Sequence, residues 1–159
     1  MTFVKMLVVG ALAIGAMDAR MAPSISLPDH NGTTVSLDSL RGRVVLVDIW
    51  ASWCAPCKAA FPAYDELFQA YRSRGFDVLA VNVDEKRGAA DQFLNGREFQ
   101  MRVLFDPAGT TPSAFKLEAM PTSYLIDKRG TIRFVHTGFT NKSIAQYKRE
   151  IEQLIVETP

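Results

Sequence analysis

A nearly unbroken run of apolar residues in the first third of the chain most constrains its fold. The run, RVVLVDIW at residues 43–50, carries apolar side chains at odd and even positions alike, with Asp48 as its one acidic residue. Because neighbouring side chains of a strand point to opposite faces of a sheet, both faces of this strand must be covered. The run therefore predicts a central strand of a sheet packed between two layers.

The rest of the chain past Pro23 alternates between strand-like and helix-like patterns. A helix is expected from residue 56 to Gly75, because its apolar residues recur at helical spacing. Asn31-Gly32 predicts an early hairpin turn, and Arg129-Gly130 a late one. Further strands are expected over 76–84 and 102–106, and further helices over 88–99 and 143–157. This order predicts an α/β sandwich, with a mixed central sheet flanked by helices and the late hairpin at one edge.

The beginning of the chain differs from the rest in composition. MTFVK supplies a positive charge, and residues 6–17 are twelve uncharged residues that end before Asp18. This run is shorter than the about 20 residues of a membrane span and fits a signal peptide or signal-anchor. We expect residues 1–22 to direct export, with residues 6–17 as a potential membrane tether, and residues 23–159 to form the folded domain. The alternative is that Met21 is the true start.

The overall charge argues against nucleic acid as a partner. The 159 residues are 48% hydrophobic and 22% charged, with a formal net charge of +1. A near-neutral chain offers no electrostatic basis for binding a polyanion. The composition is that of a globular domain with a core of its own.

The only two cysteines, Cys54 and Cys57, lie three positions apart directly after the central strand. Pro56 stands between them, at a position where the first turn of a helix tolerates proline. The amino end of a helix lowers the free energy of a nearby anion, and a thiolate is such an anion. We therefore expect Cys54 to be the attacking sulfur and Cys57, one turn into the helix, to be the resolving thiol.

Other uses of a C-x-x-C pair fit the sequence less well. A c-type haem attachment needs His after the second cysteine, where this chain has Lys58. A zinc site usually needs four ligands, and His30 and His136 stand far apart; we expect both at surface or turn positions without a role. A purely structural disulfide is disfavoured, because a disulfide that closes so short a loop stabilises the fold little. A redox-active disulfide is therefore expected, with no other cofactor and no metal.

Two motifs resemble the thioredoxin superfamily. Residues 44–62, VVLVDIWASWCAPCKAAFP, are similar to its active-site strand, C-x-P-C and helix. Residues 119–127, AMPTSYLID, resemble the segment in which the family has a cis-proline facing the cysteines, and Pro121 is that position. The resemblance implies that the backbone of Met120 pairs with an extended substrate beside the disulfide. It also implies that Trp53 and Pro56 contact the substrate.

Two further stretches resemble the TlpA/ResA-like thiol-disulfide oxidoreductases within that superfamily. Residues 22–50 are similar to their additional N-terminal hairpin, and residues 82–117 to their inserted helix. These relatives are exported or tethered to membranes, and some reduce the C-x-x-C-H of apocytochrome c. The dipeptide Ala55-Pro56 departs from the acidic residue plus proline that is common in the cytochrome-maturation members.

Two acids are candidates for moving a proton near the cysteines. Asp48 lies in an apolar strand, where burial disfavours its charged form, and it matches the buried acid of thioredoxin. Glu85 matches an acid that the subfamily places near the cysteines, although its neighbours Lys86 and Arg87 equally favour a solvated loop.

The sequence thus predicts a thiol-disulfide oxidoreductase that reduces protein disulfides in the periplasm or at the outer side of the membrane, with cytochrome c maturation among its expected settings. It requires an upstream dithiol electron donor, which a membrane protein could supply. One alternative is a cytoplasmic thioredoxin that starts at Met21. Another, of a different class, is a non-catalytic copper chaperone that uses both thiolates with His136 as a third ligand. A peroxidase is a weaker alternative, because that class shares the leading hairpin but does not need this C-x-P-C.

Overall fold

Seven strands and four α-helices follow one another in residues 20–159, the part of the chain that this computed structural model describes. The strands are β1 (Ser26–Pro28), β2 (Thr34–Ser36), β3 (Val44–Trp50), β4 (Phe76–Asn82), β5 (Arg102–Phe105), β6 (Thr122–Ile126) and β7 (Ile132–Thr137). The α-helices are α1 (Ala55–Tyr71), α2 (Arg87–Leu94), α3 (Thr110–Phe115) and α4 (Ile144–Val156). Short 3₁₀ turns lie at Leu37–Leu40, Arg72–Arg74 and Asn141–Ser143.

Five of the strands form a mixed sheet in the order β5-β4-β3-β6-β7. β3 pairs in parallel with β4 and antiparallel with β6, and all of its residues are buried, so it is the middle strand that its apolar run predicts. The β6–β7 hairpin supplies the antiparallel edge, as expected. β1 and β2 form a separate antiparallel pair around the Asn31-Gly32 turn, which confirms the N-terminal hairpin.

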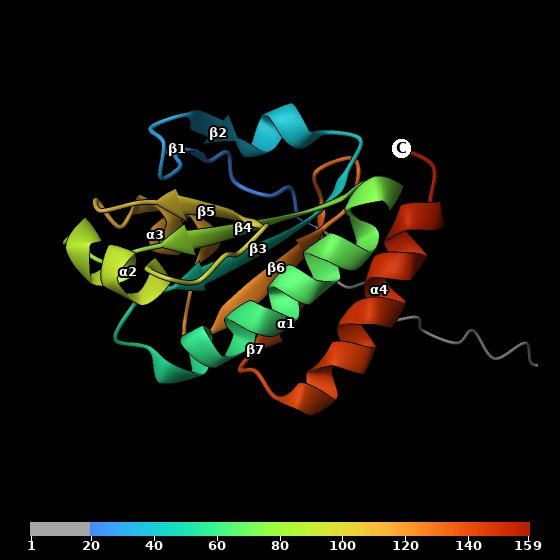
Figure 1. Cartoon of the computed structure of the whole chain (residues 1–159). Coiled ribbons are helices and arrows are strands. Elements are labelled where there is room, and N and C mark those ends of the chain that lie inside the picture. The colour runs from blue at the N-terminus through green and yellow to red at the C-terminus, as the bar shows by residue number, and fades with distance from the viewer. Residues whose placement is uncertain (1–19) are drawn as a thin grey trace, which may run out of the picture.

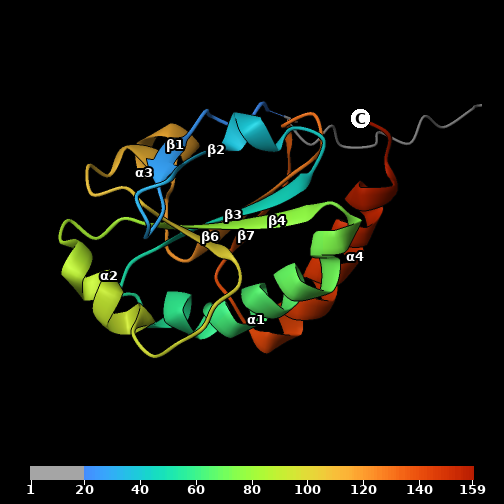
Figure 2. The same cartoon turned by 45° about the horizontal axis from the view of Figure 1, so that its top comes forward.

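Helices cover the two faces of the sheet unequally. Figures 1 and 2 show α1, α2 and α4 over one face, with α3 and the β1–β2 hairpin over the other. The alternation of side chains along β3 divides its residues between the two layers. Leu46 and Trp50 pack in the layer with α1 and α4, whereas Val47 and Ile49 pack in the layer with Phe115 of α3.

Two helices differ from the sequence-based expectation. α2 ends at Leu94 rather than near residue 99, and Gly96 follows with a positive φ of 71°. The sequence pattern does not predict α3, because six residues including a proline carry too little periodicity to reveal a helix. The Asp106 carboxylate stabilises its first turn by accepting a hydrogen bond from the Thr111 N–H at 2.6 Å.

The first described residues lie against the turn between β6 and β7. The Ala22 N–H donates to the Gly130 carbonyl, and the Ile132 N–H donates to the Arg20 carbonyl. These contacts begin before the domain start expected at Pro23. The tether expected at residues 6–17, and the expected export segment up to residue 19, lie outside the described residues. Within residues 20–159, no helix has the length and apolar character needed to span a bilayer.

Candidate active site

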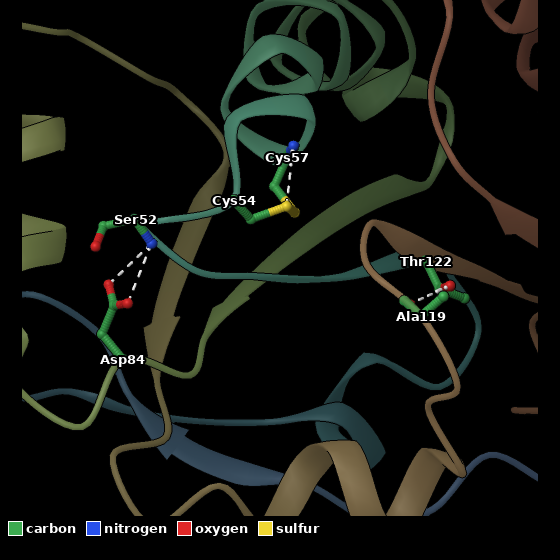
Figure 3. The surroundings of a disulfide bond; sticks show 6 residues. All are labelled: Ser52, Cys54, Cys57, Asp84, Ala119 and Thr122. Carbon is green, nitrogen blue, oxygen red and sulfur yellow. Dashed lines mark hydrogen bonds between the residues drawn. A yellow bond between two sulfur atoms is a disulfide. The ribbon is translucent and has the colours of Figure 1, made fainter.

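Cys54 and Cys57 lie where β3 passes into α1. Cys54 is the N-cap of the helix, and its Sγ accepts a hydrogen bond from the Cys57 N–H at 3.3 Å (Figure 3). The two sulfurs are bonded at 2.04 Å, so the structure shows the oxidised pair. Cys54 is 6% exposed and Cys57 is fully buried. This order of exposure agrees with the expectation that Cys54 meets the substrate and Cys57 resolves, and those roles stay predictions.

Asp84 holds the loop that carries the cysteines. Both of its carboxylate oxygens lie 3.1 Å from the Ser52 backbone nitrogen, which donates to them (Figure 3). The Asn82 side-chain amide donates to the same carboxylate at 2.9 Å. A carboxylate that accepts backbone N–H groups makes stronger hydrogen bonds than a neutral acceptor. Asp84, which follows the neighbouring strand β4, therefore holds the segment of chain that leads from β3 to Cys54.

Sequence reasoning missed Asp84 and selected the adjacent Glu85. The parallel register pairs Trp50 with Asn82, so Ser52 and Asp84 each stand two residues beyond the paired ends of β3 and β4. Aligning the two strands in this register would have identified Asp84 as the residue opposite Ser52. Glu85 is exposed, as the alternative of a solvated loop charge predicts, and its role in proton transfer stays a prediction.

A surface groove runs beside the disulfide. Its volume is about 620 Å³, and one wall is formed by residues 53–56 and the other by residues 117–120. The groove thus brings together Trp53, Pro56 and Met120, three of the residues expected to contact substrate, with Cys54. Trp53 is 73% exposed, which leaves its ring free to cover a bound chain.

The fourth expected substrate-binding residue, Pro121, directly follows the groove wall. The Met120–Pro121 peptide bond is cis, as the resemblance implies, and Pro121 is buried. The loop is held by the Thr122 hydroxyl, which donates to the Ala119 carbonyl at 2.8 Å (Figure 3), and by the Gly138 N–H, which donates to the Pro121 carbonyl at 2.7 Å. Both contacts fix the wall of the groove that faces Cys54.

Asp48 is fully buried on the side of β3 that faces α1 and α4. Neither of its oxygens has a hydrogen-bond partner in the part of the chain that the structure describes. Burial alone raises the pKa of this carboxyl from 3.8 to about 8. The sequence-based expectation that burial disfavours the charged form of Asp48 agrees with this raised pKa, and the role of Asp48 in proton transfer stays a prediction.

His136 corrects a second expectation. Its side chain is only 11% exposed, and its Nε2 lies 2.6 Å from an oxygen of the equally buried Glu150. His136 stands on β7 beneath α4, which covers it, so it is not a surface residue. The copper-chaperone alternative required His136 as a third ligand, and in the structure the His136 Nε2 is paired with Glu150. His30 is exposed, as expected.

A larger surface hollow of about 890 Å³ lies along α2 and the segment that follows it. It is lined by His30, Asp91, Arg97 and Met101, among others, and neither cysteine contributes to it. The redox chemistry therefore belongs to the smaller groove beside Cys54.

Comparisons with known proteins agree with this site. Residues 19–135 match the AhpC/TSA family. The chain is 30% identical over 144 residues to the thiol-disulfide oxidoreductase ResA of Geobacillus kaustophilus, covering 91% of this chain and 79% of that protein. A crystal structure of a proposed thiol:disulfide interchange protein DsbE from Chlorobium tepidum superposes with a TM-score of 0.82 at 38% identity, covering 86% of this chain and 96% of that one. The pneumococcal exposed lipoprotein thioredoxin Etrx1 from Streptococcus pneumoniae matches at 28% identity with a TM-score of 0.69, covering 82% of this chain and 99% of that one.

The matches extend over the strand, the C-x-P-C pair and the groove, rather than over the sheet alone. The chain therefore belongs to the AhpC/TSA family, as a thiol-disulfide oxidoreductase with a thioredoxin-like fold and ResA among its relatives.

Proposed function

We propose that this oxidoreductase reduces disulfides of protein substrates outside the cytoplasm. The observation that carries the proposal is the groove beside Cys54, which is open at the surface and lined mainly by apolar side chains. A substrate segment of extended chain fits such a groove, with its backbone beside Met120 and its sulfur at Cys54.

The difference in exposure of the two cysteines, 6% for Cys54 and none for Cys57, supports the order of the two attacks. In the reduced enzyme, the Cys54 thiolate attacks one sulfur of the substrate disulfide, and the other substrate sulfur leaves as a thiolate. Cys57 then loses its proton, for which we propose the Asp48 carboxylate as the acceptor, and attacks Cys54, which releases the second substrate thiolate and forms the disulfide seen here. Two electrons pass to the substrate, and a dithiol donor must return them to the enzyme. We propose a membrane protein as that donor.

The redox potential tests whether the enzyme is a reductant. Ala55 and Pro56 separate the cysteines, so no histidine between them stabilises the thiolate and favours the reduced form. We expect a potential of roughly −270 mV, rather than the roughly −120 mV of a strong oxidant. Equilibration with glutathione or dithiothreitol buffers, followed by counting free thiols, measures it. A value above about −180 mV contradicts the proposal.

Two observations support a site outside the cytoplasm: the apolar segment at residues 6–17, and the match to a relative described as an exposed lipoprotein. We expect that residues 1–30, fused to a reporter active only outside the cytoplasm, give an active reporter. Fractionation of the same cells reports whether the fusion stays with the membrane. An inactive reporter, together with a cytoplasmic full-length protein, favours the thioredoxin alternative that starts at Met21.

The C-x-x-C-H segment of apocytochrome c is our proposed client class, since some TlpA/ResA-like proteins reduce it. An oxidised peptide with that motif and insulin are the two substrates to compare. Faster reduction of the peptide supports cytochrome c maturation, and equal rates support a broader range of clients.

A further inference from the structure

A row of polar side chains crosses the face of the sheet that α1 and α4 cover. The strand register pairs Asp48 of β3 with Ser123 of β6, and Ser123 with His136 of β7. Residues directly paired across antiparallel strands point to the same face, with Cβ atoms about 4.5–5.5 Å apart. Ser123 is therefore the immediate neighbour of Asp48 in this buried layer.

Two tyrosines extend the row from the helices above it. The Tyr147 hydroxyl of α4 lies 2.7 Å from Ser123 Oγ and 3.1 Å from the Tyr64 hydroxyl of α1. All three residues are at most 1% exposed. Each hydroxyl carries one hydrogen and can also accept a hydrogen bond. The three hydroxyls therefore have three hydrogens, but they make only two hydrogen bonds with one another. The two contacts use two of these hydrogens, and one hydroxyl keeps a hydrogen to donate elsewhere.

The Asp48 carboxylate is the neighbouring group that can accept this hydrogen. Both of its oxygens lack a partner among the described residues, and an unpaired buried carboxylate is expensive. Burial raises the pKa of both tyrosines, and the charge of Asp48 acts in the same direction. Ser123 is paired directly with Asp48, so the contact between them requires a rotation of the Ser123 hydroxyl or of the carboxylate.

We propose that Tyr64, Tyr147 and Ser123 form a reversible chain of hydroxyls that donates a hydrogen bond to Asp48 when Asp48 is ionised. In that state Tyr64 donates to Tyr147, Tyr147 to Ser123, and Ser123 to the carboxylate. When Asp48 holds a proton, the chain can run in the opposite direction and accept from it. The inference rests on the proposed role of Asp48 as acceptor of the Cys57 proton. Tyr64, Tyr147 and Ser123 are then positioning residues that set the proton affinity of Asp48.

Other titratable groups of this layer have partners outside the hydroxyl chain, among them Tyr71, whose hydroxyl donates to Glu152 at 2.7 Å. Cys57 on α1 is bonded to Cys54 in the oxidised state. Glu150 on α4 and His136 on β7 bind each other, and the His136 ring packs on Tyr147 at 4.3 Å between centroids. On β4, Ala80 is paired with Asp48 and carries no charge. The His136–Glu150 pair thus helps to orient the Tyr147 ring.

The test is the pKa of Asp48, read from the chemical shift of its carboxyl carbon against pH in the full chain. Ser123→Ala removes the proposed donor and is expected to raise this pKa by about 1 to 2 units, the usual worth of a hydrogen bond to a charged group. Ser123→Thr keeps the hydroxyl and is expected to retain the wild-type value. Tyr147→Phe breaks the chain one step further away and is expected to raise the pKa by less.

Tyr124→Phe is a matched control from the same strand. Tyr124 is also buried, but it packs against Phe115 on the opposite face of the sheet, so its loss is expected to leave the pKa of Asp48 unchanged. If Ser123→Ala and Tyr147→Phe both leave that pKa unchanged, the hydroxyl chain is overturned. If Tyr124→Phe moves it as much as they do, the effect is general loosening of the core, which also overturns the chain.

The rate of disulfide exchange against pH, measured on the same variants, separates this inference from the function it rests on. A shifted pKa with a matching shift of the rate profile supports both. A shifted pKa with an unchanged profile supports the hydroxyl chain and contradicts the role of Asp48 in catalysis.

Discussion

Replacing Cys57 by serine is expected to abolish turnover and to leave substrates covalently attached to Cys54. Cys54 is at the groove and remains able to attack a disulfide, whereas the buried Cys57 is the group that releases the product. Without Cys57, the mixed disulfide has no internal thiol to break it. Insulin reduction is expected to fall to the uncatalysed rate.

The trapped adducts identify the clients as well as the mechanism. Cells that produce the Cys57→Ser variant are lysed in acid to stop exchange, and adducts are separated without and then with reductant. Cys54→Ser is the matched control, since it keeps one cysteine in the same motif and is expected to trap nothing. Adducts on the Cys54→Ser variant instead would reverse the assignment of the two sulfurs.

Asp48→Asn is expected to slow disulfide exchange by roughly 10²-fold near pH 8, the lower range for loss of a general base. The carboxyl has a pKa of about 8, so its ionised form, which accepts the Cys57 proton, accumulates as the pH rises through that value. The wild-type rate is therefore expected to increase through about pH 8, and the variant to lose this part of the profile. The apparent values describe Asp48 and the thiols together, because interacting groups titrate as a set.

The Asp48→Asn measurement also decides between the two candidate acids. Glu85→Gln is the comparison, and its exposed position predicts a smaller shift of the profile in the same direction. If Asp48→Asn leaves the profile unchanged and Glu85→Gln moves it, Glu85 is the proton acceptor. If neither moves it, the proton passes directly to water, and the carboxylate proposal fails.

The same substitution is expected to stabilise the fold at neutral pH. The pKa of Asp48 is raised from 3.8 to about 8, so between these values the folded state keeps a proton that the unfolded state has released. The free energy of unfolding therefore falls as the pH rises through this window. At about pH 7 the asparagine variant avoids a penalty of up to about 4 kcal/mol, because its side chain does not ionise. Denaturant unfolding of both proteins at about pH 4 and about pH 8 measures this, and a stability difference that does not grow with pH contradicts it.

The active-site strand and its cysteines could be predicted because their signals are local. The apolar run of β3 requires burial on both faces, and the cysteines stand where that run gives way to helical spacing. Asp48 follows from the same run, because a residue inside a fully buried strand is itself buried. The α3 helix could not be predicted, since its short sequence offers no periodicity and its first turn depends on the Asp106 carboxylate, which the end of β5 positions.

The partners of these residues were decided only by the tertiary structure. Asp84, not Glu85, contacts the cysteine loop, because the register of β3 against β4 brings it beside Ser52. His136 is largely covered, because α4 packs over β7 and supplies Glu150. Register between strands and the placement of helices depend on packing across the whole core, which no short stretch of sequence contains. The sequence by itself thus identified the cysteine pair and the buried acid beside it, and the fold decided which groups surround them.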